Sequence, residues 1–196
     1  MIACMTPRPV SDLIAALGVF DEVVADLADP DFDVVTCCAP WSVYDVVNHV
    51  AAVTMKFAMF ASGETDVPRT PRGDVLAGDP ISGFRGAARA SQLAWVSVDP
   101  TRQCHLPFGV FPALEAAAVN MFDVLVHGWD IADAVDRSYR IPADLLPGAI
   151  GMARRLVTAD AVATGQFAAV TSTAGVAESP VSEKRLLELT GRRWKR

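Results

Sequence analysis

Four long segments of the chain repeat apolar residues at intervals of three and four, and this helical periodicity constrains the fold more than any other feature. We expect these helices at about residues 11–27, 42–62, 81–98 and 113–135. Proline- and glycine-rich connections separate them, and the alternating pattern of strands is nearly absent. Because such helices bury their apolar faces against one another, the sequence predicts an all-α fold built as a four-helix bundle.

The second of these helices has the clearest boundaries. Ser42 followed by Asp45 three residues later is typical of a capping box at a helix start. Gly63 marks the end of the same helix, since glycine commonly closes helices. The sequence therefore predicts the position of the second helix along the chain.

The remainder of the chain is expected to form a short C-terminal extension. The elements expected there are an extended piece near 167–170 and a last helix at 182–189, and a fifth helix at 143–161 precedes them within the core. Neither an internal repeat nor a low-complexity linker divides the sequence. We therefore predict a single domain over residues 1–196, with a core at about 10–163 and the extension over 164–196.

Composition and charge exclude several classes of protein. Hydrophobic residues make up 52% of the chain, which excludes a disordered protein. Polar residues interrupt the apolar stretches before they could span a membrane, and no signal-peptide core is present, so we expect a cytoplasmic protein. The net charge of −6 argues against a nucleic-acid partner, and we interpret the basic last residues as a solvated terminus.

The four cysteines are Cys4, Cys37, Cys38 and Cys104, and none of them forms a C-x-x-C pair. The neighbours Cys37 and Cys38 are poorly placed to bridge each other. We expect neither a disulfide framework nor a thiolate zinc site, and interpret the thiols as small buried or loop residues.

A polar stripe runs along the fourth predicted helix. Its members, at steps of three, four and three, are Asn120, Asp123, His127 and Asp130. Asp123 and His127 lie one turn apart, a spacing at which a carboxylate and an imidazole can chelate one divalent ion. An ordinary surface pair on a solvent-facing stripe explains the same spacing. Polar residues on nearly the opposite side of the helix favour an enclosed helix and a stripe that faces an internal cleft.

The other two histidines are ambiguous by themselves. His49 shares a face with Asp45 and Lys56, which suggests solvent, yet the valines around it are typical of a buried helix. His105 lies in a connection and is a distant alternative as a third metal ligand. Motifs for a serine nucleophile, a phosphate loop or an H-E-x-x-H zinc site are absent from the sequence.

Two stretches carry recognisable motifs. Residues 40–50, PWSVYDVVNHV, match W-[ST]-x-x-[DE]-[LV]-[LV]-x-H-[LV], and residues 123–132, DVLVHGWDIA, are similar to [DE]-x-x-[VL]-H-x-x-D-L-A. Together they resemble the DinB-like, mycothiol-dependent maleylpyruvate isomerase family. LPFG at 106–109 and EKRLLELTGR at 183–192 are typical of an actinobacterial subgroup described as metal-binding proteins. The resemblance covers nearly the whole chain.

The resemblance implies a DinB-like four-helix bundle that holds a divalent metal between helices. Carried over to this chain, the metal ligands are His49, Asp123 and His127. The characterised isomerase branch has Glu at the position of Asp123, a departure that concerns catalytic equivalence more than metal binding. Two histidines and one carboxylate leave coordination positions open, as catalytic zinc sites do, and also suit nickel or ferrous iron.

The function implied by the resemblance is that of a metal-dependent enzyme that transfers a thiol, mycothiol, to a small electrophile or isomerises a small unsaturated acid. Asp130 and Asn48 are candidates to orient the ligands or to contact the thiol. The partners of such an enzyme would be a small-molecule substrate and a low-molecular-weight thiol. The resemblance is also compatible with a homodimer. Two alternatives stay open: a non-catalytic metal-containing bundle that acts as a sensor or regulator, and a hydrolase that uses Asp130.

Overall fold

The computed structural model of the chain describes residues 6–65, 67, 73–165, 167–169 and 181–194. It divides into two compact units, Met1–Tyr139 and Arg140–Arg196, which we describe separately. The single domain over residues 1–196 expected from the sequence stays a prediction.

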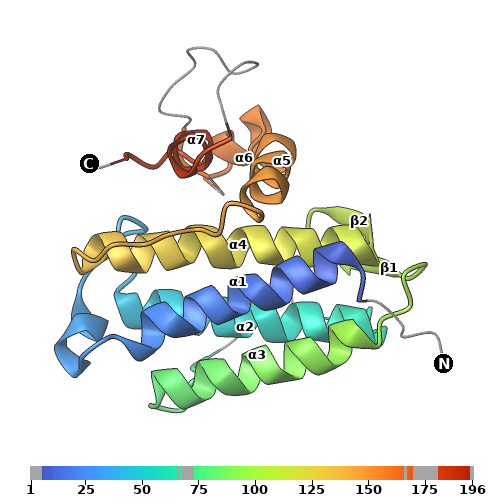
Figure 1. Cartoon of the computed structure of the whole chain (residues 1–196), viewed down its shortest axis with the longest axis horizontal. Helices are drawn as coiled ribbons and strands as arrows, with labels where there is room; N and C mark the ends of the chain where they lie inside the picture. The colour runs from blue at the N-terminus through green and yellow to red at the C-terminus, as the bar shows by residue number, and fades with distance from the viewer. Residues whose placement is uncertain (1–5, 66, 68–72, 166, 170–180, 195–196) are drawn as a thin grey trace. The chain divides into compact units, whose positions relative to one another are not determined.

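Four long α-helices form the body of the first unit (Figure 1). They are α1 (Arg8–Ala25), α2 (Val43–Ser62), α3 (Pro80–Val96) and α4 (Ala113–Ala134). Helices α1 and α2 each pack against both α3 and α4, which closes the bundle. The all-α, DinB-like four-helix bundle is therefore confirmed, and each helix lies within a few residues of its predicted bounds.

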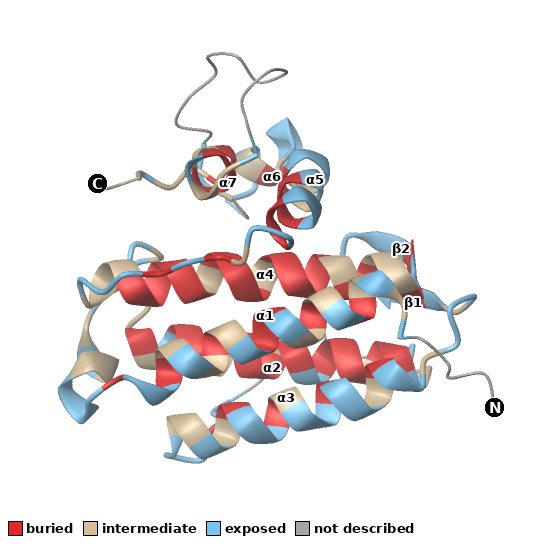
Figure 2. Cartoon of the chain, in the orientation of Figure 1, coloured by how far each residue is buried: buried red, intermediate tan, exposed pale blue. Residues whose placement is uncertain are grey.

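Helix α4 is the most enclosed of the four, as Figure 2 shows by its burial along nearly the whole length. Its buried residues include the polar Asn120 and Asp130, both fully buried. A stripe that faced solvent would leave these two side chains exposed. The interpretation of the whole stripe as a solvent-facing surface is therefore wrong: its two ends are buried, and Asp123 and His127 between them are partly exposed.

Short elements connect the long helices. A 3₁₀ helix, η1 (Asp29–Asp33), follows α1. Before α4, β1 (Gln103–Leu106) and β2 (Gly109–Pro112) form an antiparallel hairpin in which Cys104 pairs with Phe111. The sequence predicts only a connection here, because strands of four residues are too short to show a clear alternation.

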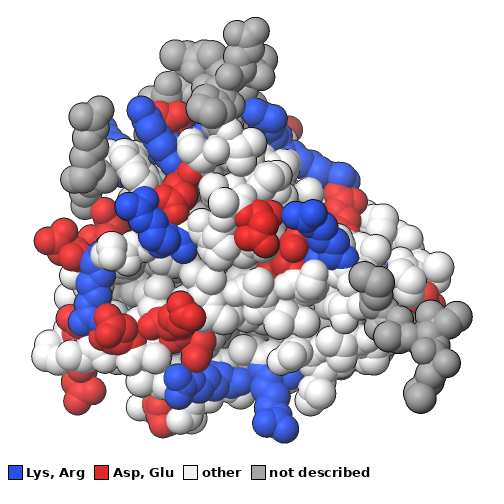
Figure 3. All heavy atoms as spheres, in the orientation of Figure 1, with Lys and Arg blue, Asp and Glu red and all other residues white. Residues whose placement is uncertain are grey.

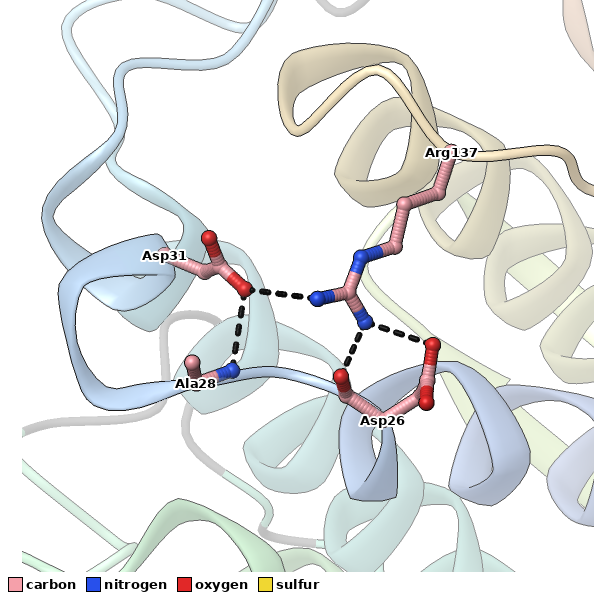
Figure 4. A network of polar contacts seen from close by, with 4 residues as sticks. All are labelled: Asp26, Ala28, Asp31 and Arg137. Carbon is pink, nitrogen blue, oxygen red and sulfur yellow. Dashed lines mark hydrogen bonds and ion pairs between the residues drawn. The ribbon is translucent and has the colours of Figure 1, made fainter.

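Arg137 ties the end of α4 to the connection between α1 and η1 (Figure 4). Its guanidinium donates to the carboxylate of Asp26 at 2.6 Å and to that of Asp31 at 3.1 Å, and it also donates to the Asp26 carbonyl. Asp31 in turn accepts from the backbone N–H of Ala28 at 2.9 Å. Segments more than 100 residues apart in sequence are joined by this one side chain.

The second unit contains α5 (Leu146–Leu156), α6 (Ala159–Ala163) and α7 (Glu183–Leu189), and α5 packs against α7. The single helix expected at 143–161 is wrong: Thr158 accepts a hydrogen bond from the N–H of Ala161 and starts α6 as a new helix. Of the extended piece expected near 167–170, residues 167–169 are not a strand and residue 170 lies outside the described residues. The last helix is confirmed.

Acidic and basic side chains are interspersed on the face drawn in Figure 3. Several of them form ion pairs, such as Arg85 with Asp21 at 2.7 Å in the first unit and Arg140 with Glu183 at 3.3 Å in the second. Among the helices of the described residues, none is both long and apolar enough to cross a membrane.

Candidate metal centre

Helix α2 positions His49 in its second turn. The Ser42 hydroxyl accepts from the N–H of Asp45 at 3.2 Å, and the Asp45 carboxylate accepts from the N–H of Ser42 at 2.9 Å, so the predicted capping box is confirmed. The His49 ring lies 4.8 Å from that of Trp41, centroid to centroid. The start of the helix and this ring contact together set the position of the imidazole.

Helix α4 positions Asp123 and His127 one turn apart. His127 Nδ1 lies 2.8 Å from the backbone oxygen of Asp123. A carbonyl oxygen only accepts, so the hydrogen of this bond is on Nδ1, and Nε2 keeps its lone pair. Metal-binding histidines commonly use one ring nitrogen for such a bond and the other for the metal.

The two helices bring these three residues together into what we call the histidine–carboxylate cluster, His49, Asp123 and His127. The distance from His49 Nε2 to Asp123 Oδ1 is 3.7 Å, and the two imidazole centroids are 4.9 Å apart. One potential ligand atom from each residue lies within 4.8 Å of the others. The side chains are 27%, 24% and 13% exposed in that order, so the cluster is reachable from outside.

The donor set fits a divalent ion. Bonds of about 2.0–2.2 Å to nitrogen and oxygen in a tetrahedral arrangement separate the ligand atoms by roughly 3.4 Å, so the His49–Asp123 distance needs only a small contraction. One turn before Asp123, the amide of Asn120 is fully buried and has no hydrogen-bond partner within the described part of the chain. A buried amide without a hydrogen-bond partner is costly, so the hydrogen-bonding capacity of Asn120 is unfilled beside the helix turn that carries Asp123.

Comparison with known protein families shows to which family the chain belongs. The family model described as the mycothiol maleylpyruvate isomerase N-terminal domain matches residues 13–132, which is more than half of the chain. The chain belongs to this family. The match contains α2 and α3 completely and all but the first residues of α1 and the last two of α4. It includes the three residues of the histidine–carboxylate cluster.

Two solved structures similar to this family member are those of the mycothiol-dependent maleylpyruvate isomerase and of its histidine-to-alanine mutant. The TM-scores are 0.62 and 0.64 at 14% and 11% identity, over 81% of this chain and 71% of each of those chains. At such low identity the likeness shows the fold, which is the DinB-like bundle expected from the sequence.

Two uncharacterized proteins of Mycobacterium tuberculosis, from the strains CDC 1551 and H37Rv, are 27% identical to the chain over 122 residues. The alignment covers 62% of this chain and 64% of each relative, so the chain matches less than two thirds of their length.

The other residues singled out in the sequence lie in different surroundings. Asn48 donates to the carbonyl of Gly73 at 3.2 Å and accepts from the N–H of Val75 at 2.8 Å, so it holds the connection between α2 and α3. His105 is exposed on β1, opposite Val110, and is outside the cluster. The part of Asn48 in orienting metal ligands stays a prediction.

Asp130 contacts two cysteines that the sequence analysis had set aside. Its carboxylate accepts from Cys37 Sγ at 3.0 Å and from Cys38 Sγ at 3.3 Å. Sequence reasoning missed this group because no spacing rule relates residues more than 90 positions apart. The adjacency of Cys37 and Cys38 was the one available signal. A role of Asp130 beside the metal stays a prediction.

Proposed function

We propose that the chain binds one divalent cation through His49, Asp123 and His127 and is a metal-dependent transferase or isomerase that uses a low-molecular-weight thiol, mycothiol. The observation that carries the proposal is the meeting of one histidine from α2 with a carboxylate and a second histidine from α4. Zinc is the ion we favour, and nickel or ferrous iron suit the same donors. Membership of the isomerase family supports the thiol.

The bound cation would supply Lewis-acid chemistry, by which a coordinated thiol loses its proton and becomes a nucleophile. The contacts of the chain suggest what its own residues contribute. His127 is held in one tautomer by the backbone oxygen of Asp123, and His49 is held against Trp41. The amide of Asn120 offers one donor and one acceptor for a polar group of the thiol or of the substrate.

The substrate class we propose is a small electrophile or a small unsaturated acid. The similar solved enzyme is a maleylpyruvate isomerase. Partial exposure of the histidine–carboxylate cluster is compatible with a small molecule that approaches from solvent. The thiolate would add to one carbon of the double bond, whose electron pair moves to the neighbouring carbon and leaves a single bond free to rotate. In an isomerisation the thiolate would leave again after this rotation, as the double bond re-forms.

Elemental analysis of tag-free protein purified without chelator tests the metal site. We expect His49→Ala and His127→Ala each to lose one equivalent of divalent metal per chain relative to the wild type, together with a lower melting temperature, because chelation stabilises the fold. His105→Ala is the matched control, since this exposed histidine lies outside the cluster, and it should keep the metal. The metal-loaded protein is then assayed with mycothiol and small electrophiles.

Three results would each change the proposal. If His127→Ala keeps both the metal content and the melting temperature, the ligand set is wrong. If the protein holds metal but consumes no thiol with any electrophile, the non-catalytic sensor or regulator takes the place of the enzyme. If zinc, nickel and iron all fail to bind on reconstitution, the bundle works without metal.

A further inference from the structure

A second group of potential ligand atoms lies in the first unit. We call it the cysteine–aspartate cluster, and its members are Cys37, Cys38 and Asp130. Each thiol donates to a different oxygen of the Asp130 carboxylate, at 3.0 and 3.3 Å. One potential ligand atom from each residue lies within 4.8 Å of the others. The thiols come from the loop before α2 and the carboxylate from α4, so folding alone brings them together.

The loop that carries the thiols is held in place by backbone contacts. Thr36 Oγ1 accepts from the N–H of Cys38 at 3.1 Å and donates to the carbonyl of Trp41 at 3.0 Å. The Thr36 N–H also donates to the Trp41 carbonyl, at 2.9 Å. These bonds close the loop upon itself. The two thiols are therefore fixed before any ion binds, which lowers the entropy cost of coordination.

Burial differs across the cluster in a way that suits an ion entering from solvent. Asp130 is fully buried, Cys38 is half-buried and Cys37 is exposed. A carboxylate removed from water is expensive unless charge or hydrogen bonds compensate it, and thiols are weak donors. A cation between the three side chains would place a positive charge directly beside this buried carboxylate.

In the cluster without a cation, the electrostatics favour the protonated thiol of Cys37. The pKa of the Cys37 thiol is raised by its hydrogen bond with Cys38, by the protein atoms that shield its sulfur in part from water and by the charge of Asp130. Without a cation the Cys37 thiol therefore keeps its proton. A bound divalent ion reverses this balance, because a coordinating thiol is deprotonated outright.

We propose that the cysteine–aspartate cluster is a second cation site, separate from the histidine–carboxylate cluster, that takes one thiophilic divalent ion such as Zn²⁺ or Cd²⁺. Binding forms two metal–sulfur bonds and one metal–oxygen bond, releases the two thiol protons to solvent and leaves a fourth position for water. Bonds of about 2.3 Å to sulfur and 2.1 Å to oxygen separate the tetrahedral ligands by roughly 3.6 Å. The observed distances need to widen by only a few tenths of an ångström. Soft thiolates favour Zn²⁺ and Cd²⁺ over hard cations such as Mg²⁺.

Titration of the metal-free full chain with Cd²⁺, in a non-thiol reductant, tests this site. Cadmium–thiolate bonds absorb in the ultraviolet by charge transfer, a signal that imidazole and carboxylate ligands do not give. We expect this absorption to saturate at one equivalent per chain, with protons released in step. The double variant Cys37→Ser, Cys38→Ser should lose the absorption and one equivalent of bound Cd²⁺, whereas Cys104→Ser, which removes a thiol outside the cluster, should keep both.

Asp130→Asn retains the thiols and the shape of the carboxylate but removes its charge. Loss of a group that merely supports a metal ligand already weakens binding about 10- to 100-fold, so we expect at least about tenfold weaker Cd²⁺ binding here. The variant His49→Ala, His127→Ala should keep the charge-transfer absorption. Absorption that survives in the double cysteine variant, or that never appears in the wild type, overturns the second site and leaves the histidine–carboxylate cluster untouched.

Discussion

Asp123 contacts one histidine through its backbone oxygen and lies near the other through its carboxylate. Its backbone oxygen accepts from His127 Nδ1 at 2.8 Å, and its carboxylate lies 3.7 Å from His49 Nε2. One residue thus orients one imidazole and offers a ligand atom next to the other. Only the carboxylate carries the negative charge that attracts a cation. A substitution of the Asp123 side chain therefore removes this charge and leaves the backbone contact that orients His127.

Asp123→Asn should therefore keep the fold and the orientation of His127 but bind metal at least about tenfold more weakly, because the loss of supporting groups already costs about that much. A titration with Ni²⁺ followed by tryptophan fluorescence measures this, since the Trp41 ring lies 4.8 Å from that of His49. Trp41→Phe should abolish the fluorescence change, whereas Trp95→Phe, on α3, should keep it. An unchanged midpoint in Asp123→Asn contradicts a role for the carboxylate.

Much of the histidine–carboxylate cluster could be predicted at the level of residues, but for two different reasons. The spacing of Asp123 and His127 within one helix follows from helix geometry. His49 lies 74 positions away, and periodicity says nothing about which residues of other helices it meets. Its place beside Asp123 was expected from the family resemblance alone. Neither helix spacing nor the family resemblance relates Cys37 and Cys38 to Asp130, so the contact between them was missed.

At the scale of elements, α3 carries two glycines with opposite surroundings. A Cβ on Gly83 would lie 2.6 Å from the backbone Cα of Leu76, whereas a Cβ on Gly86 would meet nothing within 4 Å. Both glycines lie inside the helix, where alanine is the better helix former. The difference between them is therefore one of packing and not of helix propensity.

We expect Gly83→Ala to lower the free energy of unfolding by about 1–3 kcal/mol, the usual cost of overpacking a tight contact. Gly86→Ala should raise it by about 0.5–1 kcal/mol. Urea unfolding followed by far-ultraviolet circular dichroism measures both. If the two substitutions change stability in the same direction, the close approach of α3 to Leu76 is wrong.

Helix boundaries were predictable where local chemistry decides them. The capping box of Ser42 and Asp45 and the end at Gly63 depend on residues within a turn of each other. The break between α5 and α6 was missed because the apolar pattern continues through it, and a single side chain, Thr158, begins the new helix. The hairpin of β1 and β2 depends on pairing with the opposite strand, which short strands do not signal.

At the scale of the whole molecule, a metal in the histidine–carboxylate cluster links α2 to α4 and binds the folded chain. Free metal at 100 times its dissociation constant would stabilise the fold by about 2.7 kcal/mol. For a chain of this size that is a rise in melting temperature of roughly 5–11 °C. Calorimetry with zinc and then with chelator measures it, in a Cys37→Ser, Cys38→Ser background that isolates this cluster. If the melting temperature is the same with and without zinc, a metal does not link α2 to α4 through this cluster.

The fold of most of the chain, 81% of its length, recurs in solved structures of very different sequence. At 11–14% identity the similar solved structures still match with TM-scores of 0.62–0.64. Apolar spacing, which many different residues satisfy, is enough to preserve a helical bundle. This is why the all-α fold was predictable from one sequence, while side-chain contacts between distant segments were not.

Helix α4 contributes to both clusters, with Asp123 and His127 in one and Asp130 in the other. Each residue added to a helix turns everything beyond it by about 100°. An insertion or deletion of one residue between positions 123 and 127 would therefore separate the first pair and swing Asp130 away from the thiols at once. We expect relatives that keep both clusters to differ in the residues between these positions only by other apolar residues that fit the buried core, and never to differ in their number.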